Sequence, residues 1–244
     1  MSRPRGTVPL ARALSKLGVT SRADAAALIR DGRVSVDGRV TRDPAAPVVP
    51  ERARLAIDGA AARRAPRLVL ALHKPRGVVT TTRDPEGRPT VLDLVADAPA
   101  RVVPVGRLDL ATSGLLLLTN DTRFADWVTD PAHAVPRTYA VTVRGEVSDA
   151  SAEAMRRGVA DRGERLQAGR VEVRKRSGRE THLLVVLTEG KNREVRRLVE
   201  AVGHEVTRLT RTSFGGLALG TLPPGAWRTV TSAELTAAFP GWTR

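Results

Sequence analysis

The chain has 244 residues and no cysteine, and its 40 basic residues outnumber 26 acidic ones to give a formal net charge of +14. This length suits one large or two small domains, and the lack of cysteine excludes a disulfide scaffold, a thiolate metal site and a cysteine nucleophile. No apolar run reaches about 18 residues, and Met1–Arg5 have no apolar stretch behind them, so we expect a cytoplasmic protein without a membrane span or a secretory signal.

The basic composition favours a partner that is a polyanion, most often a nucleic acid. Only four of the basic residues are lysines, and a GC-rich genome produces such a preference for arginine without any functional meaning. The excess of basic over acidic residues does not have that explanation. Aromatic residues make up only 3% of the chain, so an extended stacking platform for single strands is not expected.

Residues 1–62 are predicted to form a small basic domain. Apolar residues at helical spacing run from Leu10 to Leu17, a second helix starts after the N-cap Ser21 and ends at Gly32, and the alternation around an Asp-Gly pair predicts a hairpin over 34–40. These helices form either a solvated face or a phosphate-binding surface. The absence of acidic partners near the glycine turns favours RNA or DNA contact by five residues: Arg12, Lys16, Arg22, Arg30 and Arg33.

An Ala/Pro-rich segment over 59–66 indicates a linker, and a larger domain is predicted over 66–244. Strands are expected at 68–72, 102–105, 115–119, 138–143, 171–173 and 183–187. Helices are expected at 123–129, 149–157, 191–202 and 232–238. Because strands outnumber helices without regular alternation, the predicted fold class is α+β. It combines the small helix–helix–hairpin domain with a larger mixed, mainly antiparallel β-sheet domain flanked by helices.

The sequence does not indicate a metal or a cofactor. Its histidines stand alone, without metal-ligand spacing or an acidic partner, which is typical of structural histidines; they are His73, His133, His182 and His204. Neither a phosphate-binding loop of the Walker type nor a dinucleotide fingerprint in context is present. Any chemistry is therefore expected to use side chains alone.

Asp109 is the unusual carboxylate of the chain. It lies between Leu108 and Leu110, directly before the turn 112–114 and a leucine-rich strand. A carboxylate among apolar neighbours must be paired, hydrogen-bonded or neutralised. The side chain is therefore either a cap or turn acceptor, or a nucleophile or general base that a nearby arginine keeps ionised.

The segment 190–197 offers that arginine. On the helix expected there, the apolar residues share one face, and at 100° per residue Arg196 falls at the border of that face. Arg193 and Arg197 fall on the far side. We therefore expect Arg196 to reach the interior beside Asp109, and its two neighbours to meet solvent or RNA phosphate.

Four segments together resemble the bacterial ribosomal RNA pseudouridine synthases of the RsuA/RluB type, in the order of that family's motifs. They are Lys74-Pro75-Arg76-Gly77, the run 106–121 around Asp109, Arg137-Thr138-Tyr139, and the run 189–197. The N-terminal module is similar to the S-four-type RNA-binding domain that this family carries. The resemblance spans nearly the whole chain and implies a cofactor-free isomerase that converts uridine to pseudouridine.

The resemblance also implies roles for individual residues. Asp109 matches the catalytic aspartate, Tyr139 the tyrosine that stacks on the target base, and Arg196 the arginine that pairs with the aspartate. Arg107 matches a residue that contacts RNA beside the flipped nucleotide. The basic residues of the other matched segments are expected to contact RNA as well: Lys74, Arg76, Lys191, Arg193 and Arg197. Three positions depart from the family's pattern, Ala23, Thr122 and Glu194, where arginine, glycine and glutamine are common.

The expected partner is ribosomal RNA, free or in a pre-ribosomal particle, acted on by a monomer. The segment 84–90 favours the large over the small ribosomal subunit. The sequence leaves open which uridine is modified and whether Asp109 attacks the sugar or the base. Two rival functions are a non-catalytic ribosome assembly factor, which needs the basic surface but not the catalytic trio, and a DNA-binding regulator, which leaves the larger domain without a role.

Overall fold

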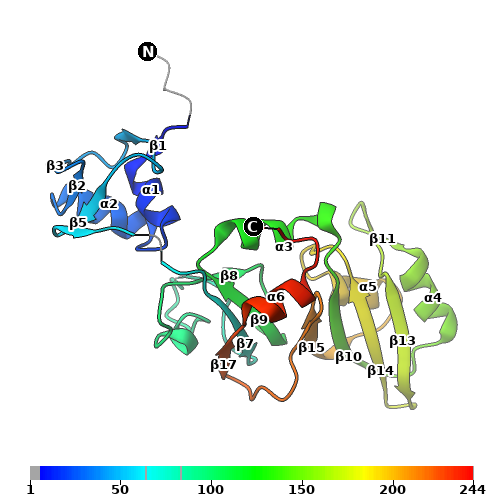
Figure 1. The fold of residues 1–244 in the computed structure, drawn as a ribbon. Helices are drawn as coiled ribbons and strands as arrows, with labels where there is room; N and C mark the ends of the chain where they lie inside the picture. Colours follow the sequence, from blue (N-terminus) through cyan, green and yellow to red (C-terminus); the bar gives the residue numbers. More distant parts are fainter. Residues whose placement is uncertain (1–5, 64, 83, 244) are drawn as a thin grey trace. The chain divides into compact units, whose positions relative to one another are not determined.

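The computed structural model of the protein describes residues 6–63, 65–82 and 84–243. These residues divide into two compact units (Figure 1). The first comprises the chain up to Leu68 together with Asp97–Val102 and Asn120–Thr122, and the second comprises the rest. The N-terminal residues 1–5 and Arg64 of the expected linker lie outside the described residues.

The first unit confirms the predicted helices and hairpin. Ser21 caps the second helix by accepting a hydrogen bond from the N–H of Asp24, and the hairpin turns at Asp37 and Gly38, both with positive φ, as a type I′ turn requires. Buried Leu10, Leu14 and other apolar residues of both helices form its core. Its elements are β1 (Val8–Pro9), α1 (Leu10–Lys16), α2 (Arg22–Arg30), β2 (Val34–Val36), β3 (Arg39–Val40), β4 (Pro47–Val48), β5 (Leu55–Ile57) and β6 (Ala60–Ala61).

The expected linker is shorter than the sequence suggested. Ala60 and Ala61 form strand β6, which pairs with β5 at the end of the sheet β3-β2-β5-β6. An alanine run carries no period-2 pattern, so the sequence did not reveal this edge strand.

The second unit is built on one large sheet. Within the described residues nine strands join it, in the order β13-β14-β10-β15-β9-β7-β17, with β16 paired to β15 and β8 to β9. The named pairs are antiparallel except for β9 with β15. The elements are β7 (Val69–Lys74), β8 (Val103–Val105), β9 (Ser113–Thr119), α3 (Thr122–Thr129), β10 (Arg137–Arg144), α4 (Asp149–Arg157), β11 (Val159–Asp161), β12 (Glu164–Leu166), β13 (Arg170–Arg176), β14 (Glu180–Leu187), α5 (Glu194–Ala201), β15 (Val206–Phe214), β16 (Leu217–Ala218), β17 (Trp227–Thr229) and α6 (Ser232–Ala238), with 3-10 turns η1 (Asp93–Val95) and η2 (Pro131–His133).

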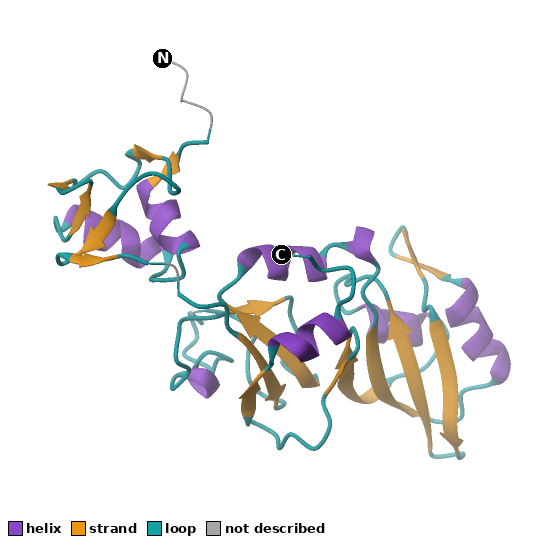
Figure 2. Cartoon of the chain, in the orientation of Figure 1, coloured by secondary structure: helices purple, strands orange, loops and turns teal. Residues whose placement is uncertain are grey.

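Helices cover this sheet through two clusters of buried side chains (Figure 2). In one cluster Met155 of α4 and Leu198 of α5 pack with Val141 and other residues of β10, β13, β14 and β15. In the other, Phe124 of α3 and Leu235 of α6 pack with residues of β7 and β9. The predicted α+β class, with a mainly antiparallel sheet flanked by helices, is confirmed.

Strand β15 was not predicted, although it lies near the centre of the sheet between β10 and β9. Its sequence interrupts apolar residues with arginines and threonines, which hides the alternation. The approach of β15 to β9 depends on Gly114, whose φ is +113°. A Cβ atom at Gly114 would lie 2.2 Å from the carbonyl oxygen of Arg211. This contact fixes the start of β9, and therefore the loop that carries Asp109.

Candidate active site

A cavity of about 350 Å³ lies between the loop before β9, the start of β10, strand β15 and the loop before α5. Its walls include Asp109 and Tyr139, two of the residues predicted to be catalytic, and Arg107, Lys191 and Arg193 of the predicted RNA-binding set. A volume of a few hundred Å³ is typical of sites for small ligands. The cavity is therefore large enough for one planar ring and its sugar.

The backbone of Asp109, not its side chain, holds the turn before β9. Its carbonyl oxygen accepts the N–H of Thr112 at 3.0 Å, and the neighbouring Leu108 carbonyl accepts the hydroxyl of Thr80 at 2.8 Å. The half-buried Asp109 carboxylate lines the cavity, and no described residue donates a hydrogen bond to it. The interpretation of this side chain as a turn acceptor is therefore wrong, and the carboxylate is available to a ligand.

Lys74 supports the Asp109 loop from inside the protein. It is fully buried, and its Nζ donates to the carbonyls of Pro75, Asp109 and Thr112 at 3.0, 3.1 and 2.9 Å. Burial lowers the pKa of Lys74 to about 8, although the Asp109 carboxylate acts in the opposite direction. The predicted RNA contact by Lys74 is wrong, because a side chain at the end of a buried strand cannot reach a ligand outside.

Arg196 lies in the interior, as its place on the helix predicted, with 9% of its surface exposed. Its Nη1 and Nη2 donate to the carbonyls of Val206 and Ala111 at 3.1 and 3.3 Å. Burial lowers the pKa of Arg196 and the charge of Arg193 adds to this, while Asp109 acts in the opposite direction. The charge of Asp109 thus acts on Arg196, but the expected ion pair between these two side chains is not formed in this structure. Arg196 instead holds the backbone of the Asp109 loop.

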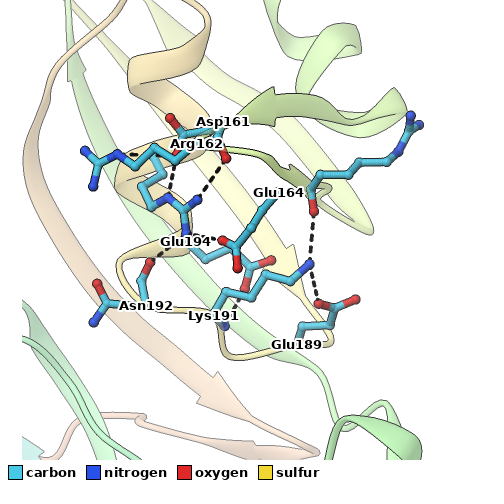
Figure 3. A network of polar contacts seen from close by, with 9 residues as sticks. Asp161, Arg162, Glu164, Glu189, Lys191, Asn192 and Glu194 are labelled. Carbon is cyan, nitrogen blue, oxygen red and sulfur yellow. Dashed lines mark hydrogen bonds and ion pairs between the residues drawn. The ribbon is translucent and has the colours of Figure 1, made fainter.

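Arg197 does not face solvent, contrary to the prediction. It is buried, its Nε donates to Asp161, and its Nη1 lies 2.7 Å from an oxygen of Glu164 (Figure 3). The hairpin of β11 and β12, which the sequence analysis missed, covers this side of α5 and supplies both carboxylates. Arg197 therefore anchors a hairpin to the helix, and its predicted contact with RNA phosphate is wrong.

The other residues of the second unit that were predicted to bind RNA are of two kinds. Lys191 is half-buried, and its Nζ lies 2.7 Å from a carboxylate oxygen of Glu189 and donates to a backbone carbonyl of β12 (Figure 3). The hydrogen bond that Lys191 donates to Glu189 raises the pKa of Lys191. Arg76, Arg107 and Arg193 are exposed, and none pairs with an acid of the described chain. These three remain available to a polyanion.

Three buried charged residues of the cavity wall escaped the sequence analysis as site residues: Arg137, Glu194 and Arg211. Each is at most 5% exposed. The guanidinium carbons of Arg137 and Arg211 both lie 4.9 Å from the centre of the Phe214 ring. Burial raises the pKa of Glu194 and lowers that of Arg137. A signal was present, since arginines that share the strand face of apolar residues are unusual.

The predicted basic residues of the first unit are all exposed: Arg12, Lys16, Arg22, Arg30 and Arg33. Arg33 nevertheless forms a bidentate ion pair with Asp58: its Nε lies 2.9 and 3.2 Å from the two carboxylate oxygens, and its Nη2 lies 2.5 Å from one of them. The expectation that these arginines lack acidic partners is wrong for Arg33. The antiparallel pairing of β2 with β5 brings Arg33, directly before β2, beside Asp58, directly after β5.

The described residues hold neither a cluster of metal ligands nor a helix that could span a membrane. No three histidine, aspartate or glutamate side chains gather there as ligands for a metal ion. None of the described helices is long and apolar enough to cross a membrane.

Comparison with known proteins identifies the class that this fold and site define. Residues 68–201 match the family described as RNA pseudouridylate synthase, and residues 8–52 match the S4 domain. The chain belongs to the RNA pseudouridylate synthase family. The predicted family and enzyme class are thereby confirmed: the protein is a pseudouridine synthase that carries an S4 domain.

Its relatives extend over almost the whole chain. An uncharacterized RNA pseudouridine synthase of Aquifex aeolicus is 37% identical, with 93% of this chain and 91% of the relative covered. The ribosomal large subunit pseudouridine synthase B of Bacillus subtilis is 34% identical, with 93% of each chain covered. A pseudouridylate synthase of known crystal structure superposes with a TM-score of 0.64 at 25% identity, covering 93% of this chain and 98% of that one.

Proposed function

We propose that the protein isomerises one uridine of large-subunit ribosomal RNA to pseudouridine. Family membership supports the reaction, and the name of the Bacillus subtilis relative supports the substrate. The observation that carries the proposal is the Asp109 carboxylate, which lines a cavity beside Tyr139 and accepts no hydrogen bond from the described chain. A carboxylate left without a partner at a cavity wall suits a residue that must react with a ligand.

The target nucleotide leaves its stack and enters the cavity. Unstacking costs a few kcal/mol, and one base-on-aromatic contact is worth about 1–3 kcal/mol, so stacking on Tyr139 offsets much of that cost. Asp109 then faces the bond between base and sugar. Arg196 keeps the aspartate loop in place through its hydrogen bond to the carbonyl of Ala111.

The reaction breaks the bond from N1 of uracil to C1′ of ribose and forms a bond from C5 to C1′. N1 gains a proton and C5 loses one, so the conversion is redox-neutral. A carboxylate that bonds transiently to the sugar or to the base suffices for it. The structure of the free protein supports either course.

The RNA around the target is held by charge. Exposed Arg107 and Arg193, which line the cavity, and exposed Arg76 are expected to contact its phosphates. The exposed basic residues of the N-terminal domain, proposed to span residues 1–62, are expected to add further phosphate contacts. The domain of residues 66–244 performs the chemistry. Free ribosomal RNA and a pre-ribosomal particle both suit this arrangement.

Release of tritium from RNA labelled at C5 of uridine tests the proposal, because that hydrogen leaves only when the new carbon–carbon bond forms. Wild-type protein is expected to release tritium from large-subunit RNA, and Asp109→Asn is expected to release none. Asp126→Asn, a change at an exposed residue of α3, serves as the matched control and keeps full activity. Tight RNA binding without release on free RNA or precursor particles would instead identify a non-catalytic assembly factor.

A further inference from the structure

Three charged side chains of the cavity wall have no part in the chemistry proposed so far. Arg137 belongs to β10, Arg211 to β15 and Glu194 to the start of α5, and all three are at most 5% exposed. Arg211 lies opposite Tyr139 in the ladder of β10 and β15, so both side chains leave the sheet on the same face. Removing charged groups from water is costly, so these residues need partners.

Two of these three side chains, those of Arg211 and Glu194, have incomplete hydrogen bonding within the described chain. Arg137 donates to the carbonyls of Val135, Thr188 and Val128 at 2.8 to 2.9 Å and is well satisfied. Arg211 donates through Nε to a carbonyl of β9 at 2.7 Å, but its buried Nη2 has no partner. Glu194 accepts the N–H of Lys191 on Oε2 at 3.1 Å, and no described residue donates to Oε1. The wall of the cavity therefore offers one acceptor without a partner in the described chain, Oε1 of Glu194.

We propose that Glu194 reads the pairing edge of the target uracil by accepting the hydrogen of N3 on Oε1. This inference rests on the proposed function. The pairing edge of uracil presents O2, the N3–H donor and O4, and a base that leaves a duplex must regain these hydrogen bonds inside the protein. A buried polar group left without a partner is costly, so base and cavity wall each satisfy the other.

The place of Glu194 suits the turning of the base. Isomerisation exchanges N1 and C5, which requires half a turn about the line through N3 and C6. During this turn O2 and O4 exchange places, whereas the N3–H group stays where it is. An acceptor opposite N3 therefore keeps its hydrogen bond before and after the turn. Glu194 is the pivot of the detached base, and it retains that base in the cavity.

The same acceptor accounts for selection of the base. Cytosine carries a lone pair at N3 in place of the hydrogen, which would face the carboxylate of Glu194. Sites built around a hydrogen bond strongly reject analogues that lack the matching group, because a buried polar group is left unpaired. The glutamine common in the family at this position also offers an oxygen acceptor, so Glu194→Gln is expected to preserve the function.

The test compares RNA affinities in the Asp109→Asn background, where no turnover occurs. Two forms of the large-subunit RNA fragment that the wild type modifies are used, one with uridine at the target and one with 3-methyluridine. The analogue has a methyl group in place of the hydrogen on N3 and keeps both carbonyl oxygens. Asp109→Asn protein is expected to bind the uridine form at least tenfold more tightly. With Glu194→Ala added the two affinities should agree within twofold, whereas with Glu194→Gln added the preference should remain.

Two results would overturn the proposal. One is equal binding of both RNAs by Asp109→Asn, which needs no change at Glu194 and therefore does not depend on how well such a variant folds. The other is an undiminished preference after Glu194→Ala. Glu146→Ala, at an exposed loop residue, is the matched control and should keep the tenfold difference. Tritium release by the wild type on the same RNA reports separately on the proposed reaction.

Discussion

The basic side chains of the first unit and those around the cavity differ in what they contact. All five predicted RNA-binding residues of the first unit are exposed, and of these Arg33 pairs with an acid. Around the cavity, Lys74, Arg196 and Arg197 are buried and donate to carbonyls or carboxylates of their own chain. In the sequence each of these positions carries a basic residue, so the motifs do not distinguish the exposed residues from the buried ones. Burial and partners separate the residues that build the site from those proposed to bind RNA.

This separation has measurable consequences. A cation that contacts phosphate releases counterions from RNA, so its loss changes the affinity and the dependence of the affinity on salt. A cation that holds a loop or a hairpin changes the turnover rate or the free energy of unfolding instead. Substitutions chosen from each region therefore fall into two classes with different readouts.

The largest effect is expected from Lys74→Met. It removes the donor that the carbonyls of Pro75, Asp109 and Thr112 share and loosens the loop that carries Asp109. A displacement of about 1 Å in a catalytic group lowers a rate on the order of 100-fold, so kcat for tritium release should fall by about that factor. The RNA dissociation constant should stay within about twofold, because Lys74 does not reach RNA. Lys16→Met, at an exposed position of the first unit, should show the reverse pattern.

The titration of Lys74 provides a second readout. Because burial lowers its pKa to about 8, the side chain loses its proton as the pH rises through that value, and the neutral amine has two hydrogens for three carbonyls. Activity should decline above pH 8 in the wild type. In Lys74→Arg, whose guanidinium stays charged, the decline should move to higher pH. A flat wild-type profile up to pH 10 would contradict the role assigned to Lys74.

Arg197→Met should lower stability rather than RNA affinity. It removes the buried partner of Asp161 and Glu164, and because both carboxylates are partly exposed we expect the free energy of unfolding to fall by about 1–3 kcal/mol. Thermal unfolding and RNA binding across salt concentrations measure the two effects. A weaker affinity with a smaller salt dependence, at unchanged stability, would return Arg197 to the RNA-binding class.

Local patterns predicted much of this fold. The spacing of apolar residues placed α3, α4 and α6 within a residue of their observed bounds, and an Asp-Gly pair placed the hairpin of β2 and β3. The helix α5 was predicted to start at residue 191, three residues before its observed start at Glu194. Arg193, the residue before the helix, takes a positive φ, so the helical conformation begins only after it. Strand β15 was missed, since its pairing depends on strands distant in the sequence.

The site was predictable only where a residue's role depends on its own neighbours along the chain. The helical position of Arg196 correctly predicted its burial. The fate of Arg197 depended on Asp161 and Glu164, which come from a hairpin more than 30 residues earlier. Likewise Lys74 meets the Asp109 loop through the pairing of β7 with β9. Contacts of this kind arise from tertiary packing and leave no periodic trace.

The smallest effect concerns single phosphate contacts in the first unit, where Arg22 and Arg33 form a matched pair. Arg22 is exposed and has no acidic partner in the described chain, whereas Arg33 is neutralised by Asp58. Arg22→Ala should lower the slope of log Kd against log salt by about one. Removal of the pair in Arg33→Ala/Asp58→Ala should leave the slope unchanged. Equal slopes for both variants would mean that exposure alone, without regard to the partner, decides which cations of this unit bind RNA.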